Sequence, residues 1–362
     1  MRLLIVPDKG RSFSSVRPEA EIYLSLAAAG HEMTICVDAQ SAYNSRYEAA
    51  NIDLLNLPYG SKLVWKHIKK LNQLIKSKNI EVVYATTSRT IPNAAMACIG
   101  TSARMVAYRG TTGGLYLTDI SNYLGVLNPR VNGVICVSNA VEDHVKERAR
   151  KSIHPFVSTI HKGHDVAWYT EPAADLTELA SDTTKFNVLC IGSHRPYKGM
   201  QYFIEALNHV KDLPELRVIL VGNGFDKPEF QYQIQATGMA DRICQPGFRQ
   251  DVPQIAKACD VLVAPSLREG LPRAVMESLA NGTPVISAAN RGTMEIIEDN
   301  KNGYIVPLED SAAIADKIRF LYNSPAELQR LTDNASEVIK GRLSHQSTVE
   351  SFTKYFSRII AQ

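Results

Sequence analysis

Two glutamates in the last third of the chain are spaced so that they could act together. Glu269 and Glu277 have seven residues between them. An apolar stretch at 261–264 comes before Glu269 and predicts a strand. Pro272 suits the first turn of a helix, where a missing N–H costs nothing, and Gly282 suits the end of that helix. The pattern predicts that Glu269 lies in the loop after a strand and Glu277 on the helix that follows.

This arrangement suits a ligand that carries both phosphate and hydroxyl groups. A helix N-terminus presents unpaired N–H groups and a partial positive charge, which favour a phosphate. Arg273 and Ala274 open the expected helix and are expected to offer such groups, whereas Pro272 has no N–H. A carboxylate accepts hydrogen bonds from sugar hydroxyls. The alternative is a chance spacing of two solvated glutamates, and the pair alone does not decide between these interpretations.

The elements that must position these residues repeat along the chain. Short apolar runs alternate with helix-period stretches twice over, which is typical of parallel sheets covered on both faces. Strands are predicted at 3–6, 33–37, 82–85, 105–108, 134–137, 157–160, 188–191, 217–221, 243–244, 261–264, 284–287 and 304–306. Helices are predicted at 20–29, 63–76, 140–149, 201–210 and 276–280. We therefore predict an α/β fold with two Rossmann-like, doubly wound domains.

A boundary between the two domains is expected where the pattern lapses. A chain of 362 residues exceeds the usual size of one core. The stretch 165–186 lacks a strong apolar period, so we expect the linker there. The expected domains are 1–165 and 166–345, and 346–362 is predicted to be an amphipathic helix. Because ligands of doubly wound sheets bind beyond the carboxyl ends of the strands, a cleft between two facing domains is the expected site.

Composition limits the class of protein. The chain is 45% hydrophobic and 21% charged, and no apolar run approaches the roughly eighteen residues of a membrane span. The six cysteines form no CxxC pair, so neither a disulfide framework nor a zinc site is indicated. Residues 1–6 read as a strand rather than a signal peptide, because the apolar run is short. These features favour a cytoplasmic location with buried structural thiols.

Charge is unevenly distributed along the chain. Residues 1–165 carry a net charge of +7 and the remainder −4. The region 62–78 combines several lysines with an apolar helical stripe. Such a helix either docks on anionic lipid or packs its apolar side on a sheet and leaves its lysines solvated. Peripheral contact with an anionic membrane, at the inner face of the plasma membrane, therefore stays open.

The residues around the two glutamates resemble a known signature. The stretches 258–266 and 269–286 are similar to the donor-binding signature of retaining glycosyltransferase family 4, the glycosyl transferases group 1, in which a Glu-x7-Glu pair follows an apolar strand. The similarity continues through 292–297 and 302–306. It implies the GT-B architecture, with a nucleotide-sugar-binding C-terminal domain and an acceptor-binding N-terminal domain onto which the final helix crosses back.

The resemblance implies contacts to a nucleotide-sugar donor. Glu269 matches the glutamate that contacts the donor sugar, and Glu277 matches the one that takes the ribose hydroxyls. The stretch 221–224 resembles a family turn that is structural or touches the base or ribose, and 247–249 lies where family members contact the base. The expected set is Gly10, Gly222, Asn223, Phe248, Arg249, Gly270, Leu271, Arg273, Ala274 and Glu277.

Two cations are implied as a grip on the donor diphosphate. The segment 192–199 resembles the family loop that reads Gly-Arg and then Lys-Gly, and Lys198 matches its lysine. Ser193 stands where arginine is common, and Arg195 comes two residues later. A leaving diphosphate gains charge as the glycosidic bond breaks, and fixed cations stabilise that charge. The alternative is that Lys198 and Arg195 are solvated surface cations.

The first domain matches the family less closely. Gly10, in the loop after the first expected strand, is a candidate for close approach to the donor phosphate. Arg109 stands where many family members have a histidine that faces the reacting sugar. Arginine cannot act as a base at neutral pH, but it can bind a phosphate, a sugar hydroxyl or an acidic acceptor. Arg109 is therefore a catalytic candidate together with Glu269, Lys198 and Arg195.

The sequence contains no Asp-x-Asp pair. Enzymes that neutralise a nucleotide diphosphate with a divalent cation usually need such paired carboxylates. We therefore expect no metal. The resemblance implies a UDP- or GDP-sugar as the donor substrate and no separate cofactor. The resemblance implies a glycan or lipid-linked acceptor in cell-surface polysaccharide or lipopolysaccharide synthesis, and nucleic acid is not expected as a partner.

Two other functions remain open at this point. A nucleotide-sugar epimerase of the same architecture would turn over donor without acceptor. A non-enzymatic protein could instead use the basic half to bind membrane or nucleic acid, with steep salt dependence and no response to nucleotides.

Overall fold

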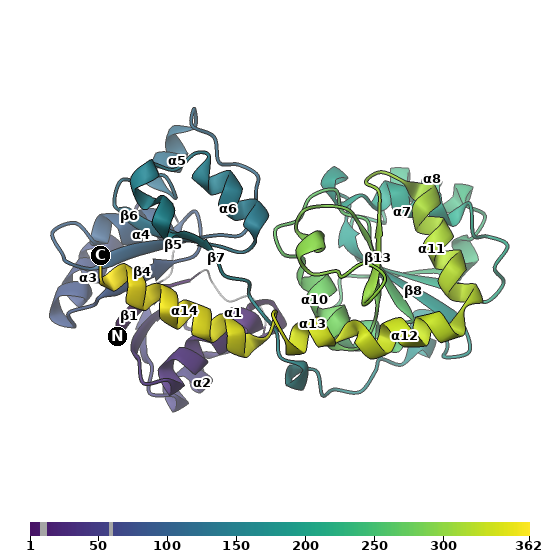
Figure 1. Cartoon of the computed structure of the whole chain (residues 1–362), viewed down its shortest axis with the longest axis horizontal. Coiled ribbons are helices and arrows are strands. Elements are labelled where there is room, and N and C mark those ends of the chain that lie inside the picture. The colour runs from purple at the N-terminus through teal and green to yellow at the C-terminus, as the bar shows by residue number, and fades with distance from the viewer. Residues whose placement is uncertain (8–12, 58–60) are drawn as a thin grey trace. The chain divides into compact units, whose positions relative to one another are not determined.

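The computed structural model describes residues 1–7, 13–57 and 61–362, with only the backbone of 13–15. The chain divides into two compact units. Unit 1 comprises Met1–Lys162 and His345–Gln362, and unit 2 comprises Gly163–Ser344. Figure 1 shows a twisted sheet with helices around it in each unit. Gly10, the candidate for close approach to the donor phosphate, lies outside the described residues.

The described part of unit 1 contains one seven-stranded sheet in which paired strands are parallel. Its order is β3-β2-β1-β4-β5-β6-β7. The strands are β1 (Arg2–Val6), β2 (Glu32–Val37), β3 (Asp53–Asn56), β4 (Val82–Ala85), β5 (Arg104–Arg109), β6 (Val131–Cys136) and β7 (Val157–Thr159). The strand order reverses direction between β1 and β4, which makes their carboxyl ends the switch point of this sheet.

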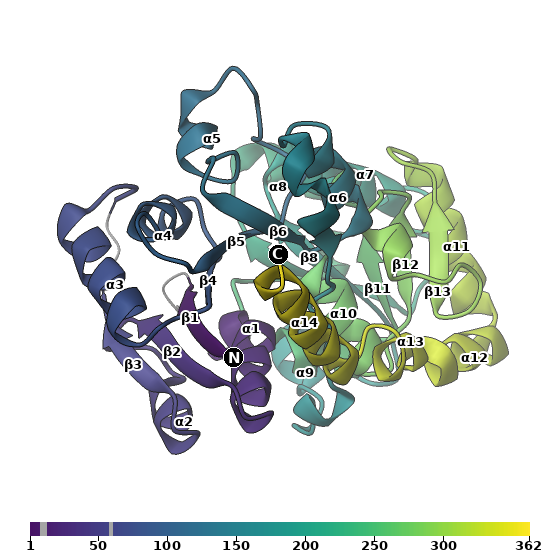
Figure 2. The same ribbon diagram turned by 60° about the vertical axis from the view of Figure 1, so that its left-hand side comes forward.

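Helices cover both faces of the unit 1 sheet (Figure 2). They are α1 (Phe13–Ala28), α2 (Asn44–Ala49), α3 (Trp65–Ser77), α4 (Thr90–Ala97), α5 (Ile120–Leu124), α6 (Asn139–Lys146) and α14 (His345–Ile360), with the 3₁₀ turn η1 (Lys151–Phe156). α1 and α14 pack together on one face, and α3 packs on α4 on the other. In α3 the apolar stripe Ile68, Leu71 and Ile75 is buried, so this stripe packs within the protein.

The last helix belongs to the first unit. Phe352 and Phe356 of α14 are buried and meet the ring of Tyr84 on β4 edge-on, with ring centroids 5.7 and 5.9 Å away. The hydroxyl of Tyr355 donates to the carbonyl of Phe156 at 2.6 Å. A side chain at Gly133 would have its Cβ 2.2 Å from that hydroxyl, so the strand can approach α14 only because glycine stands there.

The described part of unit 2 contains one six-stranded sheet, also parallel, in the order β10-β9-β8-β11-β12-β13. The strands are β8 (Phe186–Ser193), β9 (Leu216–Asn223), β10 (Ile243–Gly247), β11 (Val261–Ala264), β12 (Val285–Ala288) and β13 (Gly303–Val306). β8 and β11 are neighbours in space but not in sequence. The switch point of this sheet therefore lies between them.

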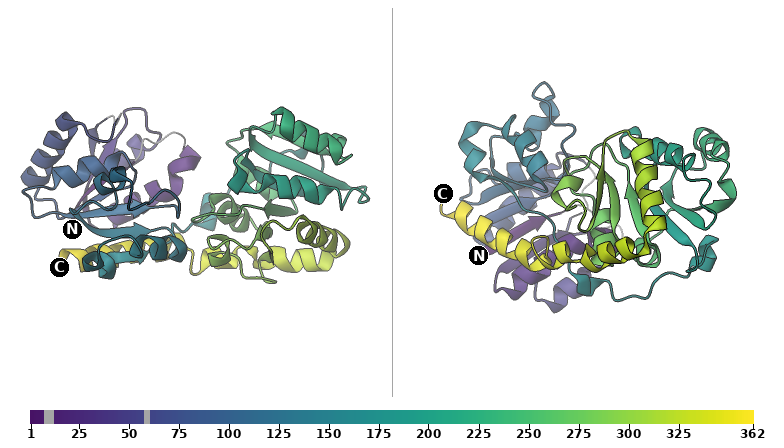
Figure 3. Two further views of the ribbon diagram at one scale, coloured as in Figure 1. Left: turned by 90° about the horizontal axis from the view of Figure 1, so that it is seen from above. Right: turned by 45° about the vertical axis from the view of Figure 1, so that its right-hand side comes forward.

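Helices also cover both faces of the unit 2 sheet (Figure 3). One face packs α7 (Met200–Leu207), α8 (Pro228–Ala236) and α11 (Ser311–Asn323), and the other packs α9 (Val252–Ala258), α10 (Arg273–Ala280) and α13 (Glu337–Lys340). α12 (Pro325–Ala335) contributes Leu331 to the first core and Ala335 to the second. The 3₁₀ turns are η2 (Val166–Trp168), η3 (Leu176–Leu179), η4 (Pro196–Lys198), η5 (Ala240–Arg242) and η6 (Thr293–Glu295).

The stretch 165–186, expected to be a linker, packs within unit 2. Leu176 and Leu179 of η3 are buried in the core that contains α9 and α10. The backbone N–H of Ala174 donates to the carbonyl of Gln254 at 3.0 Å. The expectation was wrong because two leucines three residues apart anchor a 3₁₀ turn without any longer apolar period.

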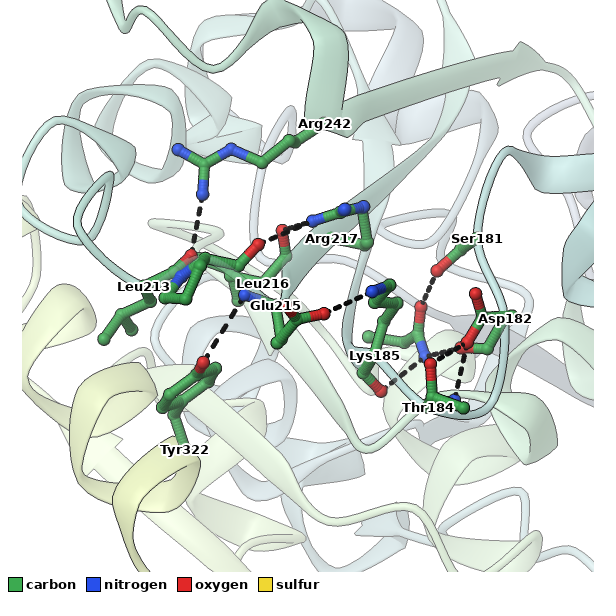
Figure 4. A network of polar contacts seen from close by, with 12 residues as sticks. Ser181, Asp182, Thr184, Lys185, Leu213, Glu215, Leu216, Arg217, Arg242 and Tyr322 are labelled. Carbon is green, nitrogen blue, oxygen red and sulfur yellow. Dashed lines mark hydrogen bonds and ion pairs between the residues drawn. The ribbon is translucent and has the colours of Figure 1, made fainter.

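A polar network closes the amino ends of the central strands in unit 2 (Figure 4). Lys185 forms an ion pair with Glu215, and the N–H of Glu215 donates to the hydroxyl of Tyr322 at 3.4 Å. Arg217 and Arg242 donate to the carbonyls of Leu216 and Leu213 at 2.9 and 2.7 Å. This network therefore holds backbone groups at the edge of the sheet opposite the carboxyl ends of the strands.

Two findings concern the whole of the described chain. None of the described helices is both long enough and apolar enough to cross a bilayer. Five of the six cysteines are buried, and Cys244 is half-buried.

Candidate active site

The unit 2 switch point brings two loops together. The loop after β8 contains η4 and ends at Lys198, and the loop after β11 carries Glu269 before α10 begins. Parallel neighbouring strands end at the same edge of a sheet, so loops that are 71 residues apart in sequence become adjacent. This edge is where open α/β sheets bind ligands.

Lys198 and Glu269 form an ion pair in this position. The ammonium Nζ lies 2.7 Å from the carboxylate Oε1. The two side chains are 27% and 17% exposed, so the pair is shielded from bulk water yet remains reachable by a ligand. A shielded setting strengthens electrostatic interactions relative to those at a fully exposed surface. The structure thus brings together the two residues predicted to hold diphosphate and sugar.

Lys198 is placed by a tight approach between the two loops. Gly199 has φ +67°, and a Cβ there would lie 2.0 Å from the carbonyl oxygen of Pro265. The N–H of Leu267 donates to the carbonyl of Tyr197 at 2.8 Å. Glycine is therefore required by both the backbone conformation and the packing, and this contact holds Lys198 beside the second loop.

Glu269 is placed by the loop after β12. The buried amide of Asn290 donates to the carbonyl of Ser266 at 2.8 Å, and its Oδ1 accepts from the N–H groups of Gly292 and Thr293, each at 3.1 Å. A Cβ at Gly292 would lie 2.6 Å from the carbonyl of Glu269. The Glu269 loop is thus braced from behind by Asn290 and by close backbone packing.

α10 starts directly after this loop. Pro272 is its N-cap residue, and the helix starts at Arg273, as the Pro272 signal predicted, so it extends three residues before the helical stretch 276–280. Pro272 makes no side-chain cap bond. The first N–H groups of an α-helix have no partner within the helix, so those of Arg273 and Ala274 are available to an anion. Gly270 and Leu271 lie between Glu269 and this helix start.

Glu277 lies one turn further along α10 and is buried. Its side chain is 7% exposed, and Oε1 lies 3.2 Å from Nε of Arg273. Burial raises the pKa of Glu277 to about 7, although the charge of Arg273 acts in the opposite direction. A carboxylate that ionises near neutral pH and has few protein partners is suited to accept hydrogen bonds from ligand hydroxyls.

The remaining expected contacts around β8 and β9 are more exposed. Arg195 is exposed, and its Nη1 donates to the hydroxyl of Tyr197 at 3.1 Å. Gly222 has φ +142°, and a Cβ there would lie 1.7 Å from the carbonyl of Gly192, so this glycine serves close strand packing. Asn223 is exposed at the end of β9.

Phe248 and Arg249 follow β10 at the same edge. The ring of Phe248 is 66% exposed. Arg249 forms a two-pronged ion pair with Asp251, with Nε and Nη2 at 2.8 and 2.6 Å from the two carboxylate oxygens. The arginine side chain is therefore engaged by the protein, whereas the phenylalanine ring is exposed.

Arg109 lies in unit 1, at the carboxyl end of β5. Its Nε donates to the carbonyl of Thr111 at 2.9 Å, and its Nη2 donates to the carbonyl of Gly113. Burial lowers the pKa of this guanidinium from its ordinary value. Arg109 lines a pocket of about 440 Å³ together with Thr86 and Lys62.

Sequence reasoning missed three positioning residues. Gly199 and Asn290 hold the two loops, and Tyr197 receives the Arg195 hydrogen bond. A glycine after a lysine was visible, but its left-handed backbone was not. Asn290 is distant in sequence from everything it braces, so no local pattern marks it. Across the described stretches 1–7, 13–57 and 61–362, no group of three or more His, Cys, Asp or Glu side chains is arranged to hold a metal ion.

Comparison with known families decides where this chain belongs. Residues 174–338 match the family described as "Glycosyl transferases group 1", and residues 20–168 match "Glycosyltransferase Family 4". The chain belongs to the glycosyltransferases that these two family descriptions cover. The two matched regions fall in unit 2 and largely in unit 1, so the family assignment rests on both units.

Curated relatives match over part of their length. The chain is 35% identical to EpsD of Bacillus subtilis over 161 residues, which are 44% of this chain and 42% of that protein. It is 29% identical over 185 residues, 49% of this chain and 45% of the relative, to an Escherichia coli enzyme named UDP-Gal:alpha-D-GlcNAc-diphosphoundecaprenol alpha-1,3-galactosyltransferase. The matched region thus spans less than half of each of these relatives.

A solved structure matches over the whole chain. HepE of Anabaena, crystallised in complex with UDP, is similar with a TM-score of 0.81 and 21% identity, covering 99% of this chain and 100% of that one. A second crystal structure of HepE contains UDP-glucose. At this identity the similarity concerns the fold, and the predicted GT-B architecture of two parallel α/β domains is confirmed.

Proposed function

We propose that this protein is a retaining, metal-independent glycosyltransferase that moves a sugar from a nucleotide-sugar to a glycan or lipid-linked acceptor. The observation that carries the proposal is the Lys198–Glu269 pair, 2.7 Å apart at the unit 2 switch point and next to the start of α10. The family and the UDP complexes of HepE support a nucleotide donor. The Escherichia coli relative, by its name, acts on a lipid-linked diphosphate sugar, which supports an acceptor in cell-surface polysaccharide synthesis.

The geometry suggests how the donor is held. The donor diphosphate would lie against the ammonium of Lys198 and the first N–H groups of α10, with Arg195 as a further cation at the rim. Glu269 would accept hydrogen bonds from hydroxyls of the donor sugar, and Glu277 from those of the ribose. Phe248 offers an exposed ring to the base. These groups accept hydrogen bonds from the ligand hydroxyls or neutralise the diphosphate charge, and none of them is assigned the role of a strong base.

The reaction then needs little proton chemistry from the protein. The bond between the anomeric carbon and the diphosphate oxygen breaks, and its electron pair goes to that oxygen. Lys198 stabilises the charge more in the transition state than in the ground state. The acceptor hydroxyl adds to the same face of the sugar, and the departing phosphate oxygen takes its proton, so configuration is retained. Arg109, which cannot act as a base at neutral pH, would bind the acceptor.

A nucleotide panel tests the donor site. Thermal unfolding is measured with UDP, GDP, ADP and CMP. A ligand at 100 times its dissociation constant stabilises by about 2.7 kcal/mol, which is readily detected. We expect UDP or GDP to raise the unfolding temperature of the wild type and of Lys185→Ala, but much less that of Lys198→Ala. If no nucleotide raises it for the wild type, the proposal fails. Donor turnover that continues at full rate without any acceptor would instead indicate an epimerase.

A further inference from the structure

Unit 1 exposes several large apolar side chains on one short segment. Between β5 and β6, Tyr116, Leu117, Ile120 and Tyr123 are 62%, 53%, 81% and 44% exposed. Ile120 and Tyr123 lie on α5, and none of that helix's residues is buried. Isolated exposed apolar residues are ordinary, but four large ones within eight residues form a patch of the kind that marks an interaction surface.

The start of α3 adds to this patch. Leu63 and Trp65 are 38% and 70% exposed. Lys62, immediately before them, lines the same pocket as Ser121 and Asn122, which directly follow Ile120. Hydrogen bonds from Ser121, and then the charge of Lys62, lower the pKa of Asp119. The two segments are therefore neighbours, and we call Leu63, Trp65, Tyr116, Leu117, Ile120 and Tyr123 the apolar rim.

The rim segment at α3 is held firmly from within. Asn93 of α4 is fully buried, and its Oδ1 accepts from the N–H of Val64 at 2.8 Å. Its amide donates to the carbonyl of Lys62 at 3.0 Å. Leu63 and Trp65 are thus presented to solvent by a fixed backbone, and they are not exposed through fraying of the helix end.

Positive charge lies beside the rim. Lys62, Lys66, Lys69 and Lys70 are exposed, and α3 contains no acidic residue. Within the part of the chain that the structure describes, none of these four lysines pairs with a carboxylate. Burial, and then the charges of Lys66 and Lys70, lower the pKa of His67 between them. Lys66, Lys69 and Lys70 therefore make α3 positively charged, whereas Lys62 lies near the carboxylate of Asp119.

The polar pocket of about 440 Å³ lies next to the rim, because Lys62, Ser121 and Asn122 line it. It is also lined by Thr86, which is 9% exposed and whose Oγ1 has no hydrogen-bond partner among the residues that the structure describes. Buried hydroxyls are normally satisfied, so this one is prepared for a polar ligand group. Arg109 contributes a cation to the same pocket.

We propose that the apolar rim inserts into the surface of an anionic bilayer, with the α3 lysines on its headgroups and the pocket beside them facing the polar head of a membrane-linked acceptor. The assignment of an acceptor to the pocket rests on the proposed function, whereas the docking does not. Tyrosine and tryptophan suit the interface because they have an apolar body and a polar tip. Uncompensated lysines match anionic lipid and would repel a second copy of the same surface.

Vesicle sedimentation of the full chain tests the surface. The probes are vesicles of phosphatidylcholine alone and of phosphatidylcholine with phosphatidylglycerol. The rim variant is Leu117→Ser with Ile120→Ser, and the matched control is Tyr232→Ser, at a residue of α8 in unit 2 that is 77% exposed. We expect the rim variant to bind anionic vesicles roughly tenfold more weakly or worse, and the control to bind like the wild type.

The lysines are tested separately. Lys66→Gln with Lys69→Gln should weaken binding to anionic vesicles by about fivefold for each lysine, and should leave the weak binding to neutral vesicles unchanged. Added salt should reduce this contribution, because the screening length falls to about 3 Å at 1 M. A lysine variant that binds anionic vesicles like the wild type would contradict the assigned headgroup contact.

Three outcomes would overturn the proposal. The wild type does not sediment with anionic vesicles, the rim variant sediments as strongly as the wild type, or the rim variant changes the oligomeric state while vesicle binding is unaltered. Thermal unfolding with UDP or GDP in the absence of vesicles is recorded for every variant. If the rim variant keeps its nucleotide response but loses vesicle binding, the variant is folded and the result supports the membrane-docking proposal. If the wild type responds to a nucleotide but does not bind vesicles, the membrane-docking proposal is wrong and the proposed function is unaffected.

Discussion

At the scale of single residues, the two glutamates of the site differ in their surroundings. Glu269 is partly exposed and neutralised by Lys198 at 2.7 Å, whereas Glu277 is buried and lies 3.2 Å from Arg273. The Glu269 carboxylate can exchange its cation for a ligand hydroxyl at modest cost. Burial makes the ionised Glu277 carboxylate unfavourable unless a ligand supplies hydrogen bonds to it. The same residue type therefore meets a ligand hydroxyl from a neutralised, partly exposed setting in one place and from a buried setting in the other.

The buried carboxyl predicts a pH dependence of stability. Burial raises the pKa of Glu277 to about 7 from an ordinary value of 4.5. Below the ordinary value, Glu277 is protonated in both states and costs nothing. As the pH rises from there to about 7, the unfolded chain loses its proton first, so folding stability falls by about 3 kcal/mol and then stays level. Glu277→Gln should therefore gain about 3 kcal/mol over the wild type between pH 4 and pH 8, as measured by urea unfolding. An equal difference at both pH values would show that the carboxyl is not buried as described.

At the scale of elements, the site depends on how closely the loops after β8 and β11 approach. Gly199 is the point of contact, since a Cβ there would lie 2.0 Å from the carbonyl of Pro265. Asn290 braces the second loop from the other side. The loops thus behave as one piece, and a change in the backbone of either should displace the Lys198 ammonium from Glu269.

Gly199→Ala and Gly238→Ala form a matched pair. Both glycines have nearly the same backbone, φ +67° and +68°, but a Cβ at Gly238 meets nothing within 4 Å. Gly238→Ala should cost only the strain of a left-handed residue, about 1 kcal/mol, and leave nucleotide binding unchanged. Gly199→Ala should cost more than that and weaken nucleotide binding by tenfold or more. Urea unfolding and calorimetric titration measure the two effects, and equal behaviour of the pair would show that the contact with Pro265 does not position Lys198.

At the scale of the whole molecule, the division into units does not follow the order of the chain, because unit 1 includes both ends of the sequence. α14 is the last helix, yet its aromatic side chains fill the core of unit 1, whereas unit 2 is one continuous stretch, Gly163–Ser344. Each unit therefore has its own core and should respond to damage on its own.

Two buried phenylalanines test this independence. Phe356 of α14 and Phe203 of α7 are both fully buried, one in each unit. Phe356→Ala and Phe203→Ala should each cost about 3–5 kcal/mol, but in different units. Hydrogen exchange should speed up in the strands of unit 1 for Phe356→Ala and in those of unit 2 for Phe203→Ala. Faster exchange across both units in either variant would mean that the chain unfolds as a single body.

The sequence was sufficient for the architecture because buried parallel strands are continuous apolar runs. All twelve predicted strands correspond to strands of the structure, and β3 was missed because Asp53–Asn56 is short and half-polar. Lys198 and Glu269 were predicted as donor contacts from two separate stretches, each of which resembles a family motif. What placed them, the left-handed Gly199 and the Asn290 brace, is a property of backbone and long-range contact. Local sequence patterns do not carry that information, and for the same reason the exposed rim around α5 could not be seen in the sequence.

The central claim is that Lys198 and Glu269 hold the donor, and sugar transfer by single substitutions tests it most directly. Transfer from the donor identified in the nucleotide panel is measured as kcat/KM for the wild type, Lys198→Ala, Glu269→Ala and Lys185→Ala. Lys185 is the control because it also pairs with a glutamate, at the opposite edge of the same sheet. The first two substitutions should lower kcat/KM by about 10²–10³, on the scale of a lost transition-state donor, and the control should change it little. If Lys198→Ala and Glu269→Ala fold and transfer sugar as fast as the control, the account of this site is wrong.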